Sequence, residues 1–325
     1  MHSRLTALLL FWVLVVSSFA ASGAEPGGFP NRPVRLVTGS SGGAADYVSR
    51  LVAQKLSERW GHQVVVDNRA AQAGIIGMGA AARSTPDGHT LAVGLTGTHA
   101  APQFLYQSIP YDPVKDFIPV TTLSNSGIAL VVHPSLSVKD ARDFVAYAKS
   151  KPGGVSYASA GTGTTSQLGG ELFNQMTQAR LVHVPYKGAG LAFVGLLSGE
   201  SPSGFVAASS ATPHVIAGKL RALLVLSEKR SPATPNIPSA PEAGFPGINA
   251  SVWTGMFVPA NTPKMLVNRI NRDVVDILNL PETRQLLEKQ GGEAIPSTPE
   301  AFTAFLASEI SKWGKVIKEA GLKSE

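Results

Sequence analysis

Two glycine-rich loops with hydroxyl side chains are the segments of this sequence best suited to hold an anion. They read Gly39-Ser40-Ser41-Gly42-Gly43 and Ser159-Ala160-Gly161-Thr162-Gly163-Thr164-Thr165. Each follows a short apolar run that predicts a strand and precedes a segment that predicts a helix. The first N–H groups of a helix lack partners within it, and the helix dipole makes that end partly positive. Such junctions therefore predict anion sites. Hydroxyl donors would come from Ser40, Ser41, Thr162, Thr164 and Thr165.

Two charged residues stand close to these loops. Asp46 falls in the first turn of the helix predicted after the first loop, where it could favour the helix dipole or orient a ligand or water at a cleft. Lys187, beside Tyr186, follows a predicted strand and is either a solvated lysine or a positive charge near the second loop. The sequence leaves both pairs of alternatives open.

An enzymatic interpretation starts from the same first loop. Gly39-Ser40-Ser41-Gly42-Gly43 matches the G-x-S-x-G pattern of a serine hydrolase, and several histidines follow it. However, the loop leaves the first predicted strand, and no histidine has a recognisable partner. The second loop lacks the third glycine and the acidic residue of a dinucleotide fingerprint. We therefore expect no catalytic residues, no cofactor and no metal site.

The elements that must position these loops alternate between strand and helix. Apolar runs at residues 34–38, 64–67 and 90–94 predict strands, separated by helices at 44–60 and 73–83. A second strand-helix series begins near residue 128, after a turn predicted at Asn125-Ser126-Gly127. This alternation indicates an α/β protein with mainly parallel sheets flanked by helices. In such sheets ligands lie beyond the carboxyl ends of the strands, so one loop from each half could grip the two ends of a small dianion.

The N-terminal residues and the composition indicate export. Arg4, an apolar run over residues 5–16 and small residues up to Ala24 form the pattern of a signal peptide, covering residues 1–24 with Ala20 as the alternative cleavage site. The 325 residues include no cysteine, yet a chain of this length can build a core without disulfides. The net charge of +6 is scattered rather than clustered, which disfavours nucleic acid as a partner. The sequence thus predicts a periplasmic protein.

Several segments together resemble the Bug family, the periplasmic solute receptors of tripartite tricarboxylate transporters. The resemblance spans essentially the whole chain after the signal peptide. It is carried by Pro33-Val34-Arg35-Leu36-Val37, Gly42-Gly43 with Asp46, Val64-Val65-Val66-Asp67-Asn68-Arg69, Pro86-Asp87-Gly88-His89-Thr90-Leu91, Tyr111-Asp112-Pro113-Val114-Lys115-Asp116-Phe117, Tyr157-Ala158-Ser159-Ala160-Gly161, His183-Val184-Pro185-Tyr186-Lys187-Gly188, Gly218-Lys219-Leu220-Arg221-Ala222-Leu223 and Lys312-Trp313.

The resemblance implies a two-lobe, type II periplasmic-binding-protein fold of the Venus-flytrap kind. Lobe one would comprise residues 30–125 and 225–325, and lobe two residues 126–224, with a hinge near Asn125 and Leu224. The ligand would be a small carboxylate: a dicarboxylate, a tricarboxylate, an acidic amino acid or an aromatic acid. A membrane permease would be the second partner. Three features depart from the family pattern: Thr38-Gly39-Ser40-Ser41 stands before Gly42-Gly43 in place of the usual Pro-Phe-x-Pro, Gln167 replaces a common histidine, and Val206 stands where an aspartate is usual.

Carried onto this sequence, the resemblance predicts a cleft with these ligand-binding residues: Ser40, Ser41, Gly42, Gly43, Asp46, Ser159, Ala160, Gly161, Thr162, Thr164, Thr165, Gln167, Tyr186 and Lys187. The expected function is a periplasmic receptor that delivers its carboxylate to a permease. The alternatives are the serine hydrolase described above and a sensor or scavenger receptor without its own permease.

Overall fold

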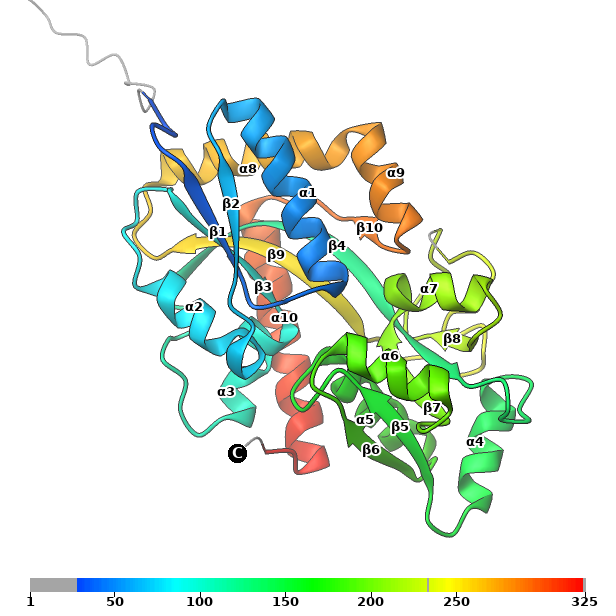
Figure 1. Ribbon diagram of the computed structural model, residues 1–325. Helices are drawn as coiled ribbons and strands as arrows, with labels where there is room; N and C mark the ends of the chain where they lie inside the picture. The colour runs from blue at the N-terminus through cyan, green and yellow to red at the C-terminus, as the bar shows by residue number, and fades with distance from the viewer. Residues whose placement is uncertain (1–27, 233, 324–325) are drawn as a thin grey trace, which may run out of the picture.

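The computed structural model describes residues 28–232 and 234–323 (Figure 1). The strands are β1 (Val34–Thr38), β2 (Val64–Asn68), β3 (Thr90–Leu95), β4 (Phe117–Val132), β5 (Val155–Ser159), β6 (Leu181–Pro185), β7 (Ser203–Ala207), β8 (Arg221–Val225), β9 (Ser251–Pro259) and β10 (Glu293–Ala294). The helices are α1 (Gly43–Trp60), α2 (Ile75–Ala82), α3 (Pro102–Leu105), α4 (Ala141–Ser150), α5 (Thr165–Thr177), α6 (Ala189–Ser198), α7 (Ala208–Ile216), α8 (Lys264–Asn279), α9 (Pro281–Lys289) and α10 (Pro299–Ala320), with shorter turns η1 (Ala71–Gly74) and η2 (Thr96–Ala100). The predicted signal peptide lies outside the described residues.

The strands form two lobes that share one long strand, β4 (Figure 1). In lobe one, β2, β1 and β3 are parallel, and β9 and the first part of β4 continue the sheet antiparallel to them. In lobe two, β6, β5 and β7 are parallel, and the last part of β4 pairs antiparallel with β7 and β8. The predicted α/β, two-lobe fold is confirmed. It was not predicted from the sequence that β4 and β9 run antiparallel to their neighbours.

The turn predicted at Asn125-Ser126-Gly127 is wrong, because β4 runs through these residues without a break. They pair with Trp253, Val252 and Ser251 of β9. Gly127 has another role: a Cβ there would lie 2.2 Å from Cγ1 of Val225, so the glycine allows β8 to approach the strand. A glycine inside a strand often marks such a close approach rather than a turn.

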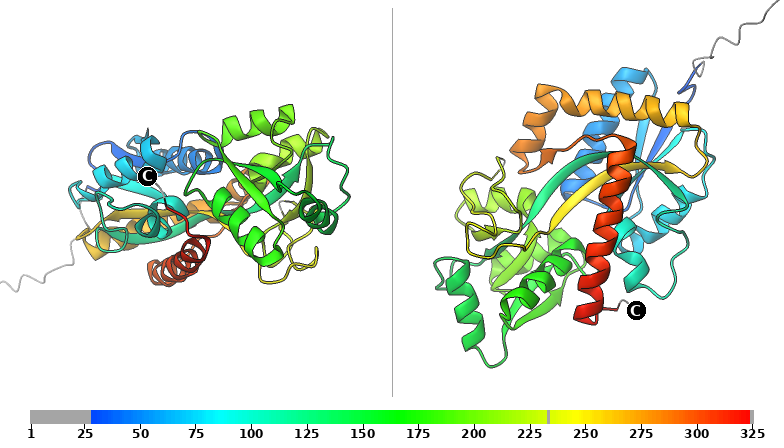
Figure 2. Two further views of the ribbon diagram at one scale, coloured as in Figure 1. Left: turned by 90° about the horizontal axis from the view of Figure 1, so that it is seen from below. Right: turned by 180° about the vertical axis from the view of Figure 1, so that it is seen from behind.

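Apolar helix faces build the core on both sides of the sheets. In lobe one, α1 buries Val48, Val52 and Leu56 in the same cluster as Ile270 and Val274 of α8. The long α10 buries Phe302 and Trp313 in a second cluster that also holds Leu168 and Phe173 of α5 in lobe two. Figure 2 (right) shows α10, in red, running from lobe one down beside lobe two. This helix therefore connects the two lobes on the face shown there.

Candidate functional site

A cavity of about 660 Å³ lies between the two lobes. The structure brings ten of the fourteen predicted site residues to its wall: Ser40, Ser41, Gly42, Gly43, Ala160, Gly161, Thr162, Thr164, Thr165 and Lys187. Asp46, Ser159, Gln167 and Tyr186 are not among the lining residues. Both predicted loops thus face the same space.

Four helix N-termini converge on this cavity. Its lining includes the residues at or next to the start of α1, α5, α6 and α7, whose N-cap residues are Gly42, Thr164, Gly188 and Ala207. None of the four N-caps forms a side-chain capping hydrogen bond. Of their first N–H groups, that of Ser209 in α7 donates to Oγ of Ser126 at 3.0 Å. The remaining N–H groups and the partly positive helix ends can face an anion in the cavity. The sequence predicted the first two junctions and missed those of α6 and α7.

A hydrogen-bond network behind the first loop fixes its shape. The Asn68 side-chain amide donates to the Ser40 carbonyl and to Oδ1 of Asp46, each at 2.6 Å. Arg50 Nε donates to Oδ2 of Asp46 at 3.0 Å. Partial burial by itself would raise the pKa of Asp46, but the hydrogen bonds from Arg50 and Asn68 outweigh it and lower the pKa below its usual value. Asp46 therefore anchors the loop from behind rather than lining the cavity.

His183 holds the second loop from below and was not predicted as a site residue. Its Nε2 lies 2.6 Å from Oγ of Ser159, and its Nδ1 lies 3.2 Å from Nε2 of Gln167. The Gln167 Oε1 in turn accepts from the backbone N–H of Gly163 at 2.7 Å. Ser159 and Gln167 are both buried. The structure thus makes them supports of the loop that presents Thr162 and Thr164.

Two histidines, the buried His99 and the half-buried His183, give this fold a stability that depends on pH. Burial lowers the pKa of His183 to about 4 and that of His99 to about 3, whereas an unfolded histidine titrates near about 6.5. Between these values the unfolded chain binds more protons than the folded chain. The free energy of unfolding is therefore expected to be highest above about pH 6.5 and to fall as the pH drops toward about 4. Urea unfolding across this pH range measures the free energy of unfolding. In His183→Asn that free energy should fall less with decreasing pH. A fall equal to that of the unchanged protein would show that His183 does not cause the pH dependence.

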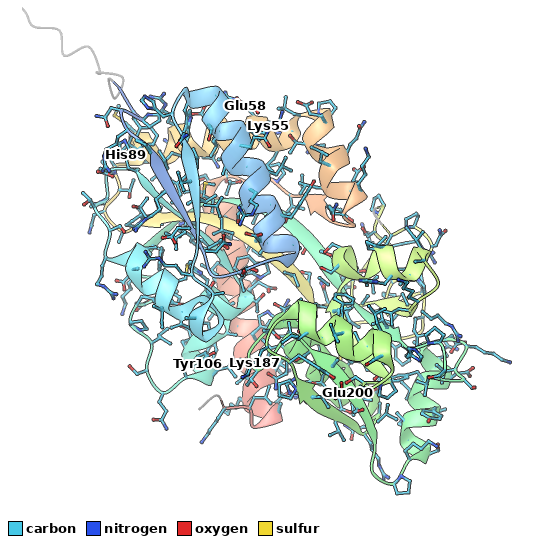
Figure 3. All side chains as sticks on the ribbon, in the orientation of Figure 1. Lys55, Glu58, His89, Tyr106, Lys187 and Glu200 are labelled. Atoms are coloured by element: carbon cyan, nitrogen blue, oxygen red, sulfur yellow. The ribbon has the colours of Figure 1, made fainter. Side chains whose placement is uncertain are left out.

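Tyr186 and Lys187 are neighbours with different surroundings. The Tyr186 hydroxyl lies 3.0 Å from Oγ of Ser201, and the backbone N–H of Tyr186 donates to the Ser159 carbonyl at 3.1 Å. Tyr186 therefore connects two loops of lobe two. Lys187 is exposed and is the only charged side chain among the described residues that line the cavity. Figure 3 labels Tyr106 on lobe one and Lys187 on lobe two, near the boundary between the lobes.

Sequence analysis missed the apolar part of the wall. The lining also includes Leu95, Tyr106, Ile128, Phe193, Val206 and Val252. Ser210, in the first turn of α7, adds one more hydroxyl. Apart from Val206, none of these positions carried a signal, because an apolar residue in a strand or helix usually indicates core.

The geometry offers neither a hydrolase triad nor a metal site. Within residues 28–232 and 234–323, no histidine hydrogen-bonds to Ser40 or Ser41, and Ser40 Oγ donates to the Gly42 carbonyl at 3.0 Å. The same residues contain no group of three metal-ligating side chains. None of the described helices is long and apolar enough to cross a membrane.

Comparison with known proteins decides the family. The family model described as "Tripartite tricarboxylate transporter family receptor" matches residues 48–322. The chain belongs to this receptor family. The resemblance seen in the sequence is thus confirmed. Protein BugT of Bordetella pertussis is 32% identical over 323 residues, which cover 99% of this chain and 98% of BugT.

Solved structures of similar receptors agree with the family assignment. A protein of R. palustris determined with adipate superposes with a TM-score of 0.86 at 33% identity, covering 91% of this chain and all of that chain. MatC from Rhodopseudomonas palustris with bound malate gives a TM-score of 0.81 at 31% identity, covering 89% of this chain and all of MatC. The structure of the periplasmic binding protein BugD gives a TM-score of 0.82 at 29% identity, covering 91% of this chain and all of that chain. The family is thus one of binding receptors and not of enzymes, as expected from the sequence.

Proposed function

We propose that this receptor captures a small carboxylate between its lobes in the periplasm and delivers it to a membrane permease. The observation that carries the proposal is the convergence on one interlobe cavity of four helix N-termini whose own N-cap residues form no side-chain capping hydrogen bond. Helix N-termini attract carboxylates through their free N–H groups and their dipoles. The adipate and malate bound to the two similar receptors belong to the same chemical class.

The charges around the cavity support an anionic ligand. Lys187 lies at the wall, and no acidic side chain lines the cavity among the described residues. The Asp46 carboxylate is turned to Asn68 and Arg50 instead. An anion would therefore meet one positive charge and several N–H donors without a nearby repelling carboxylate.

Closure of the lobes is the proposed response to the ligand. The sequence suggests lobe one at residues 30–125 and 225–325 and lobe two at 126–224, joined near Asn125 and Leu224. Contacts of residues 226–250 favour a second crossing nearer Ala250, because Phe245 packs on Phe173 of α5 and the Ala243 carbonyl accepts from Arg142 of α4. A ligand that contacts both lobes would stabilise the closed form by its higher affinity for that form.

A thermal-shift screen of the protein without residues 1–24 tests ligand capture. The panel contains dicarboxylates, tricarboxylates, acidic amino acids and aromatic acids. A ligand present at about 100 times its dissociation constant should add about 2.7 kcal/mol of stability. No shift with any carboxylate would overturn the proposal. Uptake of the identified ligand by cells with and without this receptor then separates delivery to a permease from sensing or scavenging.

Removal of the Lys187 charge should weaken carboxylate binding without abolishing it. Because the lysine is exposed, its pairing with an anion resembles a surface ion pair, and Lys187→Met is expected to raise the dissociation constant by about twofold to fivefold. The loss should shrink at high salt. Isothermal titration measures it, with Lys149→Met on α4 as the control. Unchanged affinity at low salt would show that Lys187 does not face the ligand.

A further inference from the structure

Part of the cavity wall is hydrocarbon. Ile128 of β4, Val206 of β7 and Phe193 of α6 line the cavity, yet they are only 0%, 3% and 8% exposed. Val252 of β9 also lines the cavity, and we call these four residues the apolar floor: Ile128, Phe193, Val206 and Val252. Ile128 and Val252 pack with the core cluster that includes α5, and Phe193 and Val206 belong to the cluster that includes α6, so the floor spans both faces of the sheet end. None of these side chains can donate or accept a hydrogen bond.

The backbone of the apolar floor is also occupied. Ile128 pairs with Ala207, and Val206 pairs with Ala129, in the antiparallel β4–β7 ladder. Val252 pairs with Ser126 in the β4–β9 ladder. A hydroxyl or ammonium group of a ligand placed on this floor would lose its water and find few partners. Burial of such a group without a partner is unfavourable.

The polar groups of the cavity lie on the helix ends and at its edge. They are the N-termini of α1, α5, α6 and α7 and these side chains: Ser40, Ser41, Tyr106, Thr162, Thr164, Thr165, Ser166, Lys187 and Ser210. Among the described lining residues there is no carboxylate to hold an ammonium group. The volume of about 660 Å³ lies in the range of pockets for drug-sized ligands. A four-carbon acid would therefore leave much of the floor without contact.

From this division of the wall we infer that the receptor selects carboxylates with an apolar, ring-sized body and discriminates against hydroxy acids and amino acids. This inference rests on the proposed function and narrows it. The carboxylate lies at the helix N-termini, and the hydrocarbon body covers Ile128, Phe193, Val206 and Val252. Burial of that body removes apolar surface from water, which favours binding.

Isothermal titration with four acids tests the inference. Benzoate and cyclohexanecarboxylate carry the apolar body, whereas malate and glutamate carry a hydroxyl or an ammonium group. We expect the two ring acids to bind at least about tenfold more tightly than malate or glutamate, a difference of about 1.4 kcal/mol. Equal or tighter binding of malate or glutamate would overturn the inference and leave the proposed function standing. Failure of every carboxylate, here and in the wider screen, would overturn both.

A variant of the floor provides a second test. Val206→Thr keeps the shape of the side chain and adds a hydroxyl, so the affinity for benzoate should fall about tenfold while that for malate stays the same or rises. Val131→Thr is the matched control, because Val131 is a buried β4 valine of the same cluster that does not line the cavity. The readout is the benzoate-to-malate affinity ratio, which a general loss of stability would not change. The same ratio in both variants would contradict the assignment of the floor.

Discussion

Replacement of Glu309 by alanine is expected to lower the free energy of unfolding by about 3–5 kcal/mol, the usual cost of breaking a buried charge network. Glu309 of α10 is 5% exposed, and its Oε2 accepts from the indole N–H groups of Trp253 and Trp313, each at 2.8 Å. Its other oxygen pairs with Lys312. Alanine would leave two fully buried indole N–H groups without an acceptor. Urea unfolding monitored by tryptophan fluorescence measures the loss.

Two variants of the same helix control this prediction. Glu309→Gln keeps a carbonyl acceptor and should lose less stability than Glu309→Ala. Glu319→Ala removes a carboxylate that is 54% exposed and forms a long ion pair of 3.9 Å with Lys315. The free energy of unfolding should therefore change by no more than about 1 kcal/mol. A Glu309→Ala loss no larger than that of Glu319→Ala would show that the indole hydrogen bonds do not fasten α10 to β9.

Gly161→Ala is expected to weaken ligand binding by about tenfold or more, because a misplaced binding loop loses its aligned donors. Gly161 has a φ of +126°, which favours glycine, and a Cβ there would lie 2.9 Å from the Tyr186 carbonyl. The second loop is joined to residues 186–188 by a hydrogen bond of 3.0 Å from the Gly188 N–H to the Ala160 carbonyl. The contact with the added Cβ would push the loop away from this segment. Isothermal titration with the acid found in the screen measures the effect.

Gly190→Ala is the matched control for Gly161→Ala. Gly190 lies in α6 close to the same loops, but a Cβ there meets nothing within 4 Å and the residue does not line the cavity. Its affinity should match that of the unchanged protein. If both alanine variants bind equally well, the conformation of Gly161 does not control the position of the donors.

The local elements could be predicted because their signals are local. The strands over residues 34–38 and 64–67 and the helix over 44–60 follow from apolar runs and from three- and four-residue spacing. Thr298 caps α10 by accepting from the Ala301 N–H at 3.1 Å, as its position before Pro299-Glu300 suggests. The false turn at Gly127 shows the limit of such signals. The sequence does not distinguish a glycine in a turn from one that, like Gly127, makes room for a neighbouring side chain such as Val225.

For the site, the sequence by itself determined the two glycine- and hydroxyl-rich loops, the nearby Lys187 and the family to which the chain belongs, because residue type and short-range order carry those signals. Only the tertiary structure decided which predicted residues face the cavity. Asp46 and Gln167 turned out to brace the loops, while Ile128 and Val252 became its wall. The reason is that β4 and β9 cross between the lobes and bring together residues more than a hundred positions apart, and a polar side chain in a loop can face its own backbone as readily as a ligand.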